Sequence, residues 1–292
     1  MKGDAMTKLL YLECTSGISG DMCAAALLDA GASEEAVRRA LESLPVEGFA
    51  VEISRVKKSG LDVCDFSVVL DAAHENHDHD MAYLHGHGGA SEHGHGHDHD
   101  RDHGRAHDHD HAHGAPGGHH HRGPAEIAQI IDGAAMTDGA KAIAHRMFGF
   151  VADAEARAHG VPVGEVHFHE VGAVDSIADI IAIAVAADDL APDGVVVSDL
   201  PCGYGTVRCQ HGLIPVPAPA TAFIAEAAGL TLSPVDVEGE LVTPTGAAAA
   251  AALRTEAALP ERFSIKAIGM GAGKRAYDTP GILRAMIIEP AE

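Results

Sequence analysis

The sequence predicts an α/β or α+β protein in which helices flank a mixed β-sheet, and in which a disordered histidine-rich insertion interrupts that fold. Short apolar or alternating segments, which are typical of strands, are interleaved along the chain with longer segments of helical periodicity. The apolar fraction of 46% is enough for a sizeable core. Aromatic residues make up only 4%, so Ala, Val, Ile and Leu must form that core, and small side chains permit close packing of helices on a sheet.

The N-terminal part of the α/β domain is predicted at residues 8–73. Its first strand is apolar, and the glycine-containing turn after it leads into a helix. Ser33 is a suitable N-cap for a second helix, because its side-chain oxygen can accept a hydrogen bond from the helix backbone. The expected elements are a buried strand at 8–13, a turn at 14–20, helices at 21–30 and 33–44, and strands at 49–56 and 63–70.

Residues 74–122 interrupt this pattern. The segment holds 17 of the 22 histidines, interleaved with Asp and Gly, and it cannot form a packed core. Imidazole and carboxylate ligands suit divalent transition metals. A disordered segment cannot hold its ligands in a fixed geometry, so we expect metal storage or delivery here rather than catalysis. The alternative is a solubilising loop whose metal affinity is incidental.

The remainder of the α/β domain is predicted at residues 123–290. A stretch rich in Gly and Pro at 201–219 is expected to be an ordered loop or an edge strand, because Pro cannot donate to a central strand. The other expected elements are helices at 124–132, 137–159, 174–190, 218–227 and 245–258, and strands at 163–170, 194–198, 263–268 and 282–288.

The charge and the cysteines restrict the classes of partner and compartment. The formal charge is −23, without a basic stripe, so binding to a nucleic acid is not expected. An acidic surface either is simply solvated or collects metal cations. No apolar run reaches membrane-spanning length. The five cysteines are an odd number without a C-x-x-C pair, so we expect reduced thiols and a cytoplasmic protein.

The clearest ordered motif is HFHEVGAVDSIAD at 167–179. His167 and His169 lie two residues apart, so in a strand both project to one face and can share a metal ion. Asp175 and Asp179 lie at i and i+4 of the following helix, on one face. Two imidazoles and one or two carboxylates make a metal site; the alternative is a strand end followed by an ordinary acidic first turn.

Two further motifs precede predicted helices and suit an anion. In SGISGD, Gly17 and Gly20 let backbone N–H groups approach a phosphate, and Ser16 and Ser19 add hydroxyls. The motif lacks the G-K-[ST] of a P-loop, so a plain turn with Ser19 as N-cap is an equal alternative. In EGELVTPTG at 238–246, a Thr before Pro244 is a suitable N-cap. The candidate residues of these two motifs are Ser16, Gly17, Ser19, Gly20 and Asp21, then Thr243 and Thr245, with Glu240 as a metal ligand or base.

A third candidate region is CGYGTVRCQHGLIPVPAP, which begins at Cys202. Cys209 and His211 lie on one side of an extended segment, so they offer a sulfur and a nitrogen ligand. A single cysteine is more often a small buried apolar residue, which is the alternative for Cys209.

Several segments resemble, in matching order, the LarC-type nickel insertion proteins. They are LYLECTSGISGDMCAAALLDAG, AHGVPVGEVHFHEVGAVDSIADI, HGLIPVPAPAT, EGELVTPTGAA and IGMGAGKR. The resemblance covers nearly the whole chain outside the histidine-rich segment, and HFHEVGAVDSI together with EGELVTPTGAA is highly specific. One departure is Glu13, which stands where the family usually has Asp.

The resemblance implies a pyridinium-3,5-bisthiocarboxylic acid mononucleotide nickel chelatase, a lyase-class enzyme that completes the nickel-pincer nucleotide of lactate racemase-type enzymes. It also implies dependence on CTP and on a divalent cation, Mn or Mg, through a C-terminal portion. The chain resembles the N-terminal portion, so the resemblance implies that CTP acts through the C-terminal portion. A small-molecule nucleotide substrate, nickel-dependent racemase recipients and a homo-oligomer are the expected partners.

We assign roles to the candidate residues as a hypothesis of our own. His167, His169 and Asp175 are predicted to bind metal near the reacting centre, with Glu170 and Asp175 as catalytic groups. Further metal candidates are His211 and Glu240. The alternative function is that of a nickel storage protein or metallochaperone without catalytic activity, for which the histidine-rich segment alone would be sufficient.

Overall fold

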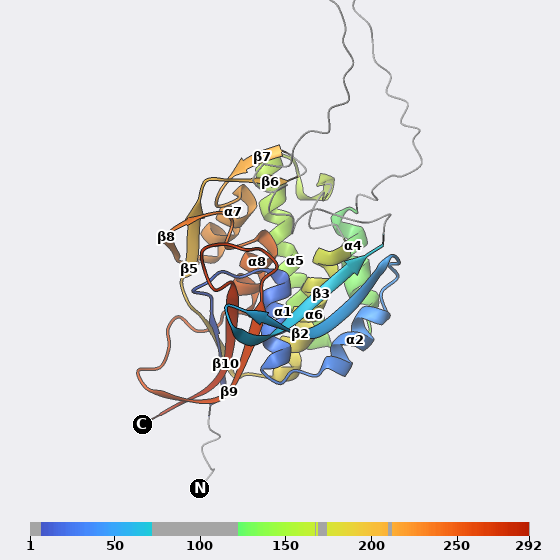
Figure 1. Ribbon diagram of the computed structural model, residues 1–292. Coiled ribbons are helices and arrows are strands. Elements are labelled where there is room, and N and C mark those ends of the chain that lie inside the picture. The colour runs from blue at the N-terminus through green and yellow to red at the C-terminus, as the bar shows by residue number, and fades with distance from the viewer. Residues whose placement is uncertain (1–6, 72–121, 167, 169–173, 210–211, 292) are drawn as a thin grey trace, which may run out of the picture.

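The computed structural model describes residues 7–71, 122–166, 168, 174–209 and 212–291 (Figure 1). The histidine-rich insertion predicted at 74–122 lies outside the described residues except for Arg122. In chain order the elements are β1 (Leu9–Glu13), α1 (Gly20–Asp29), α2 (Glu34–Glu42), β2 (Phe49–Lys58), β3 (Leu61–Leu70), α4 (Pro124–Gly133), α5 (Asp138–His159), η1 (Val163–Glu165), α6 (Val174–Leu190), β4 (Gly194–Val197), β5 (Leu200–Tyr204), β6 (Thr206–Cys209), β7 (Gly212–Pro215), α7 (Pro219–Ala228), β8 (Leu232–Glu238), α8 (Pro244–Leu253), β9 (Phe263–Ala272) and β10 (Ile282–Pro290).

The main sheet has six strands in the order β2-β3-β9-β10-β1-β4. The pairs β1–β4 and β3–β9 are parallel, and the other three neighbouring pairs are antiparallel. Two smaller sheets pair β5 with β8 and β6 with β7. The mixed sheet with flanking helices confirms the predicted fold class.

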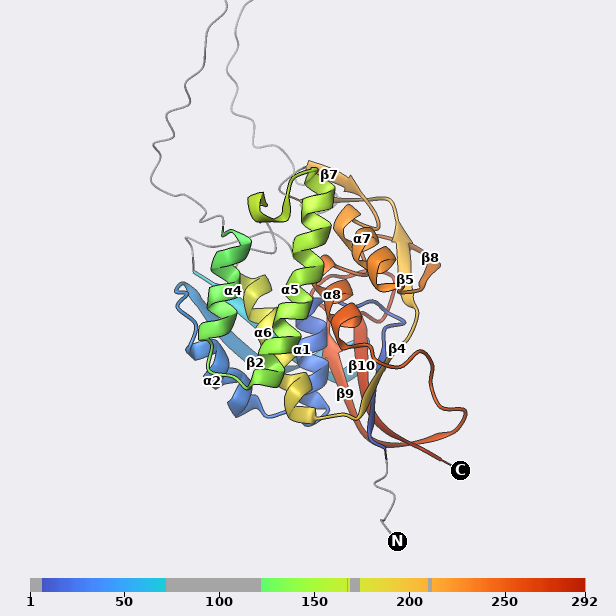
Figure 2. The same ribbon diagram turned by 180° about the vertical axis from the view of Figure 1, so that it is seen from behind.

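The helices lie against one face of the main sheet, as the two opposite views show (Figures 1 and 2). Helix α1 packs directly on β9, where glycines let the two backbones approach closely. A Cβ atom on Gly269 would lie 2.1 Å from the Ala26 carbonyl oxygen, and one on Gly271 would lie 2.1 Å from that of Met22. These glycines therefore determine how close the first helix lies to the sheet.

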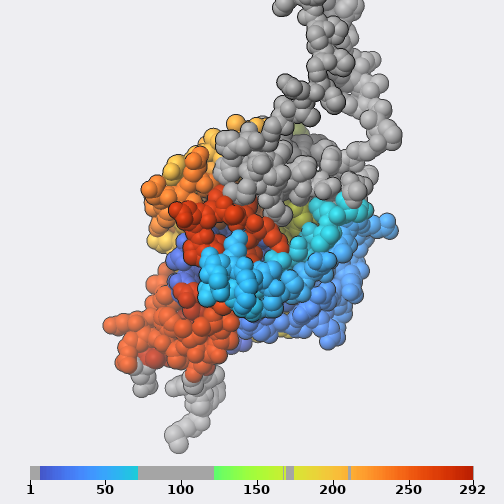
Figure 3. All heavy atoms as spheres, viewed as in Figure 1, coloured from blue at the N-terminus to red at the C-terminus, as the bar shows by residue number. Residues whose placement is uncertain are grey.

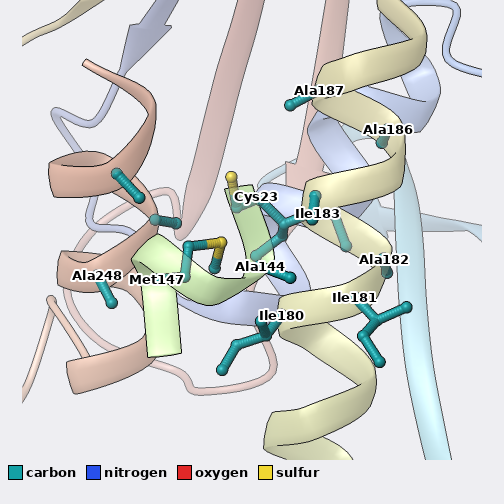
Figure 4. Packing of buried hydrophobic residues seen from close by; sticks show 14 of the residues in the cluster. Cys23, Ala144, Met147, Ile180, Ile181, Ala182, Ile183, Ala186, Ala187 and Ala248 are labelled. Atoms are coloured by element: carbon teal, nitrogen blue, oxygen red, sulfur yellow. The ribbon is translucent and has the colours of Figure 1, made fainter. Parts of the chain in front are cut away.

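The helical layer is held together by small side chains, as the composition predicted. Figure 4 shows Ala144 and Met147 of α5 next to Cys23 of α1, Ile180 of α6 and Ala248 of α8. All five side chains are at most 1% exposed. Alanine on facing helices shortens the distance between their axes, so apolar contacts fill the interior with few large aromatic rings.

The segment at 163–170 was predicted as a strand, but its described part is not a strand. Val163–Glu165 is a single turn of 3-10 helix, which begins three residues after Gly160 ends α5 in the left-handed conformation. Val166 and Phe168 are both buried, and the Phe168 ring lies edge-on to Phe148 with centroids 5.2 Å apart. The apolar residues here therefore pack onto α5 rather than alternate on a sheet.

Two other boundaries also differ from the prediction. Helix α8 ends at Leu253 rather than near 258, because the next residue, Arg254, is extended and donates from Nη2 and Nη1 to the carbonyls of Ala228 and Gly229. Strand β8, which contains Pro234, was not predicted; it pairs only with β5, where a proline is tolerated. Among the described helices, none has both the length and the apolar character needed to cross a membrane.

Candidate functional site

A pocket lies where the first residues of α1, α6 and α8 meet the loop between β9 and β10. Phe66 and Val68 of β3 form part of its apolar wall. Its charged and hydroxyl-bearing lining residues include Ser16, Ser19, Asp21, Asp175, Asp179, Glu240, Thr243, Thr245, Lys274, Arg275 and Tyr277. The pocket therefore gathers residues from three motifs that are far apart in the sequence.

Backbone hydrogen bonds hold two of these motifs side by side. The Ile18 N–H donates to the Leu241 carbonyl at 2.9 Å, and the Thr243 N–H donates to the Ile18 carbonyl at 3.2 Å. Gly17 has φ of 110°, and a Cβ atom there would lie 2.4 Å from the Leu241 oxygen, so only glycine fits. The predicted turn at 14–20 and the predicted segment at 238–246 thus form one wall.

The beginning of α1 is surrounded by carboxylates. Ser19 takes the N-cap position as predicted, but its hydroxyl makes no capping bond and donates instead to Asp21 Oδ1. The same oxygen accepts the Met22 N–H at 2.9 Å. A Cβ atom on Gly20 would lie 2.1 Å from Asp179 Oδ2, so this glycine makes room for that carboxylate.

Asp175 and Asp179 both line the pocket from α6, which confirms that the two carboxylates share one helix face. Burial raises the pKa of Asp179 well above its usual value, and the neighbouring charges of Asp21 and Asp175 raise it further. Asp21 Oδ2 is buried and has no hydrogen-bond partner among the described residues. Three carboxylates close together in a partly desolvated wall favour a bound cation.

The predicted metal site remains a prediction. His167, His169, Glu170 and His211 lie outside the described residues. Within the described part of the chain, no group of three His, Cys, Asp or Glu side chains is arranged to hold a metal ion by itself. Of the predicted metal ligands, the described part places Asp175 and Glu240 in the pocket wall.

Glu240 is buried and forms an ion pair with Arg275, with Glu240 Oε2 2.5 Å from Arg275 Nη1. Lys274, the residue before Arg275, forms an ion pair with Asp65 of β3. Sequence reasoning did not select Lys274 or Arg275, although the run GAGKR was part of the family resemblance. Two adjacent cations after a glycine-rich strand end are the signal that could have indicated them.

The beginning of α8 is capped as predicted. The Thr243 hydroxyl oxygen accepts the Gly246 N–H at 3.1 Å, and Pro244 occupies the first helical turn. Thr245 is 7% exposed and lines the pocket. The proposed contacts of Thr243 and Thr245 with a ligand are consistent with this placement but stay predictions.

All five cysteines are free thiols. Cys209 is buried and lies in the pocket wall, which fits the small apolar alternative, and its role as a ligand stays a prediction. Burial raises the pKa of Cys14 to about 12, and it also raises the pKa of Cys23. Both thiols are therefore protonated and unreactive at neutral pH.

The fold and the pocket together define a class: an α/β protein with a pocket at three helix beginnings, lined by carboxylates, hydroxyls and the cations Arg208, Lys274 and Arg275. The chain belongs to the nickel insertion protein family, whose model matches residues 10–292. No solved structure matches the chain.

The names of several similar proteins also state the compound into which nickel is inserted. A pyridinium-3,5-bisthiocarboxylic acid mononucleotide nickel insertion protein of Alkaliphilus metalliredigens (strain QYMF) is 47% identical over 286 residues, which are 97% of this chain and 61% of the relative. Proteins of the same name from Geobacillus kaustophilus (strain HTA426) and Staphylococcus saprophyticus subsp. saprophyticus are 37% and 33% identical over 97% and 96% of this chain. The chain spans about three fifths of the length of these relatives.

Proposed function

We propose that this chain inserts nickel into pyridinium-3,5-bisthiocarboxylic acid mononucleotide, a step in the synthesis of the nickel-pincer nucleotide cofactor. The observation that carries the proposal is the convergence of 16–21, 174–179 and 240–245 on one pocket of mixed charge. The relatives named for this activity, and the family to which the chain belongs, support the same reaction.

Nickel is the cargo of this reaction, so it must be held and then released. Imidazole and carboxylate ligands suit that task, since they bind nickel without the tight sequestration of a cage of thiolates. We propose that His167, His169 and Asp175 hold nickel beside the substrate, with Glu170 or Asp175 as a base. His211 and Glu240 are secondary ligands in this proposal, and the buried carboxylates of Asp21 and Asp179 increase the attraction for the cation.

The remaining polar residues would bind the organic substrate. The backbone of the turn at 16–20, with Gly17 and Gly20 allowing close approach, and the hydroxyls of Ser16, Ser19, Thr243 and Thr245 supply hydrogen-bond donors. The apolar wall that includes Phe66 suits the face of a pyridinium ring. Metal and nucleotide would thus be held within one pocket, which places the reacting groups next to one another.

We propose a nickel chelatase of the lyase class that works with a C-terminal portion, through which CTP and Mn or Mg act. The completed cofactor would pass to nickel-dependent racemases. Free thiols at all five cysteines support a cytoplasmic location, and we propose that the protein acts there as a homo-oligomer.

An insertion assay tests the site. Asp175→Asn and the double variant His167→Ala, His169→Ala are expected to lower nickel insertion at least about tenfold, measured as nickel-containing product by mass spectrometry with the C-terminal portion and CTP present. The matched control is Asp189→Asn, which removes an exposed carboxylate at the far end of the same helix. Unchanged insertion in the pocket variants would show that the site is assigned wrongly.

Nickel storage without catalysis is the second candidate, and the 17 histidines of the insertion favour it. Deleting residues 74–121 separates the two functions. Insertion that survives the deletion with ample nickel supports catalysis at the ordered pocket, with the insertion as a supply device. A chain that binds nickel through the insertion but catalyses no nickel insertion, with or without residues 74–121, would support storage alone. A chain that inserts nickel only when the C-terminal portion is added would instead be one part of a two-part catalyst.

A further inference from the structure

The loop between β9 and β10, residues 273–281, brings two cations to the pocket. Its two ends are joined by a hydrogen bond of 2.9 Å from the Gly273 N–H to the Gly281 carbonyl. Lys274 and Arg275 follow directly, and both line the pocket. In Figure 3 this loop lies at the surface against the β2–β3 hairpin.

The β2–β3 hairpin holds this loop in place through Lys58. The Lys58 ammonium donates to the Gly273 carbonyl at 2.6 Å and to the Arg275 carbonyl at 2.9 Å. Partial burial lowers the pKa of Lys58, in keeping with an ammonium that bonds to carbonyl oxygens away from water. The carbonyls on both sides of Lys274 are thereby fixed, so the direction of the two cationic side chains is set before any ligand binds.

Each of the two cations is paired with a carboxylate. An ammonium has three N–H donors and a guanidinium has five. Lys274 donates to Asp65, and Arg275 donates from Nη1 to Glu240, whose side chain is only 6% exposed. An ammonium or guanidinium has more donors than one carboxylate bond requires, and an arginine fork suits the oxygens of a phosphate.

Another positive end in the pocket, the N-terminus of α1, is already next to negative charge. The Asp21 carboxylate accepts the Met22 N–H, and the Asp179 carboxylate lies against Gly20. A doubly charged phosphate placed there would meet these groups at short range, which is unfavourable in a partly desolvated pocket. The cationic loop differs, since each carboxylate that it contacts, Asp65 and Glu240, is paired with a cation, and the charge of Lys274 also offsets that of Asp179.

We propose that Lys274 and Arg275 form the phosphate-binding end of the pocket and recognise the phosphate of a pyridinium mononucleotide. The proposal rests on the proposed function for the identity of the ligand. It moves the phosphate from the turn at 16–20 to the loop at 273–281. The carboxylate-rich beginning of α1 is then left to the cation and to the positively charged ring.

Calorimetric titration with nicotinic acid mononucleotide and with its dephosphorylated nucleoside tests this assignment. The probes need no nickel, so the result is independent of insertion activity. We expect the chain to bind the mononucleotide at least about tenfold more tightly than the nucleoside. Lys274→Gln and Arg275→Gln are each expected to remove most of that preference while leaving the nucleoside affinity unchanged.

Two sets of controls make the experiment decisive. Lys266→Gln removes an exposed lysine of β9 that pairs with Glu289 outside the pocket, and it should leave the preference intact. The double variant Lys274→Gln, Asp65→Asn avoids an unpaired half-buried carboxylate, so a folded protein is obtained even if the single variant is unstable. Circular dichroism melting confirms the fold of each variant.

The outcomes separate this proposal from the proposed function. The phosphate site is overturned if Lys274→Gln and Arg275→Gln both still prefer the mononucleotide to the nucleoside. It is also overturned if the unmodified chain binds the two probes equally, even if nickel insertion is demonstrated. Loss of the preference in Ser16→Ala or Ser19→Ala, with Lys274→Gln unaffected, would return the phosphate to the turn at 16–20. Failure of nickel insertion alone would leave the phosphate site standing.

Discussion

At the scale of single residues, Gly20 lies in close contact with the carboxylate of Asp179. A methyl group on Gly20 would lie 2.1 Å from Asp179 Oδ2, so the carboxylate would have to move. We expect Gly20→Ala to lower the free energy of unfolding by about 1–3 kcal/mol, the usual cost of overpacking. Urea unfolding measures the change.

The matched control is Gly149→Ala, within α5, where an added methyl group meets nothing within 4 Å. Alanine there is expected to raise the free energy of unfolding by about 0.5–1 kcal/mol, since glycine disfavours a helix interior. A lower free energy of unfolding in Gly20→Ala and a higher one in Gly149→Ala would support the contact between Gly20 and Asp179. A Gly20→Ala protein as stable as the wild type would show that Asp179 does not occupy this position in solution.

Asp179 also makes stability depend on pH. Burial first, and then Asp21 and Asp175, raise its folded-state pKa above the ordinary value of 3.8, while Lys274 opposes the shift. Above pH 3.8 the unfolded chain therefore releases this proton before the folded chain does. The contribution of Asp179 to stability accordingly falls as the pH rises from 3.8 through the folded pKa.

Asp179→Asn should remove this dependence. We expect the variant to match the wild type near pH 3.5 and to exceed its stability increasingly as the pH rises, measured by urea unfolding in metal-free buffer with a chelator. Asp236→Asn, which changes an exposed carboxylate on β8, controls for the loss of one charge. If the free energies of unfolding of wild type and Asp179→Asn changed with pH in parallel, the raised folded-state pKa of Asp179 would be contradicted.

At the scale of elements, the cap of α8 connects stability to the pocket. Thr243 Oγ1 accepts the Gly246 N–H, and Thr243 lines the pocket. We expect Thr243→Ala to lower the free energy of unfolding by about 1 kcal/mol, whereas Thr243→Ser keeps the oxygen and most of the stability. Chemical denaturation compares the three proteins. Equal losses of unfolding free energy in Thr243→Ala and Thr243→Ser would show that the threonine methyl group, rather than the capping oxygen, stabilises the helix.

The helices could be predicted from sequence because local signals determine them. Ser33, Thr137 and Thr243 each cap a helix through a hydroxyl that accepts a backbone N–H three residues on. The strand predicted at 163–170 failed because Phe168 packs against Phe148 of α5, a contact that periodicity within a short window cannot reveal. Strand β8 was missed because Pro234 is tolerated only where a strand has a free edge.

The pocket could be predicted only in part. The motifs at 16–21 and 240–245 indicated anion-binding helix beginnings, and their juxtaposition depends on hydrogen bonds between Ile18 and residues 241 and 243. Lys274 and Arg275 carried only a weak signal, two adjacent cations after a glycine-rich strand end. Their place in the pocket follows from Lys58, more than 200 residues earlier, which holds their loop.

At the scale of the whole molecule, the sheet order explains why these segments meet. Strand β1 lies between β10 and β4, so the turn after β1 emerges beside the C-terminal hairpin rather than beside its neighbours in sequence. Strand β3 lies beside β9 and carries Asp65 and Phe66 to the same region. The site is therefore a property of the complete sheet, and fragments from either side of the insertion would lack one wall of the pocket.

The histidine-rich insertion, in contrast, is expected to be separable from this fold. Strand β3 ends at Leu70 and α4 begins at Pro124, so replacing residues 74–121 with a flexible linker of about 12 residues retains both elements. Shortening a flexible loop roughly fourfold lowers its closure entropy cost by about 1 kcal/mol. We therefore expect the free energy of unfolding to stay unchanged or to rise by up to about that amount.

The number of nickel ions bound per chain should fall sharply in the same variant, because most of the imidazole ligands are removed. Urea unfolding measures the free energy of unfolding and equilibrium dialysis measures the nickel bound per chain, both on one preparation. A linker of equal length that replaces every histidine with Ser separates the loss of ligands from the change in loop length. If the shortened chain failed to fold while the Ser-substituted chain folded, the insertion would be part of the fold rather than an appendage for metal.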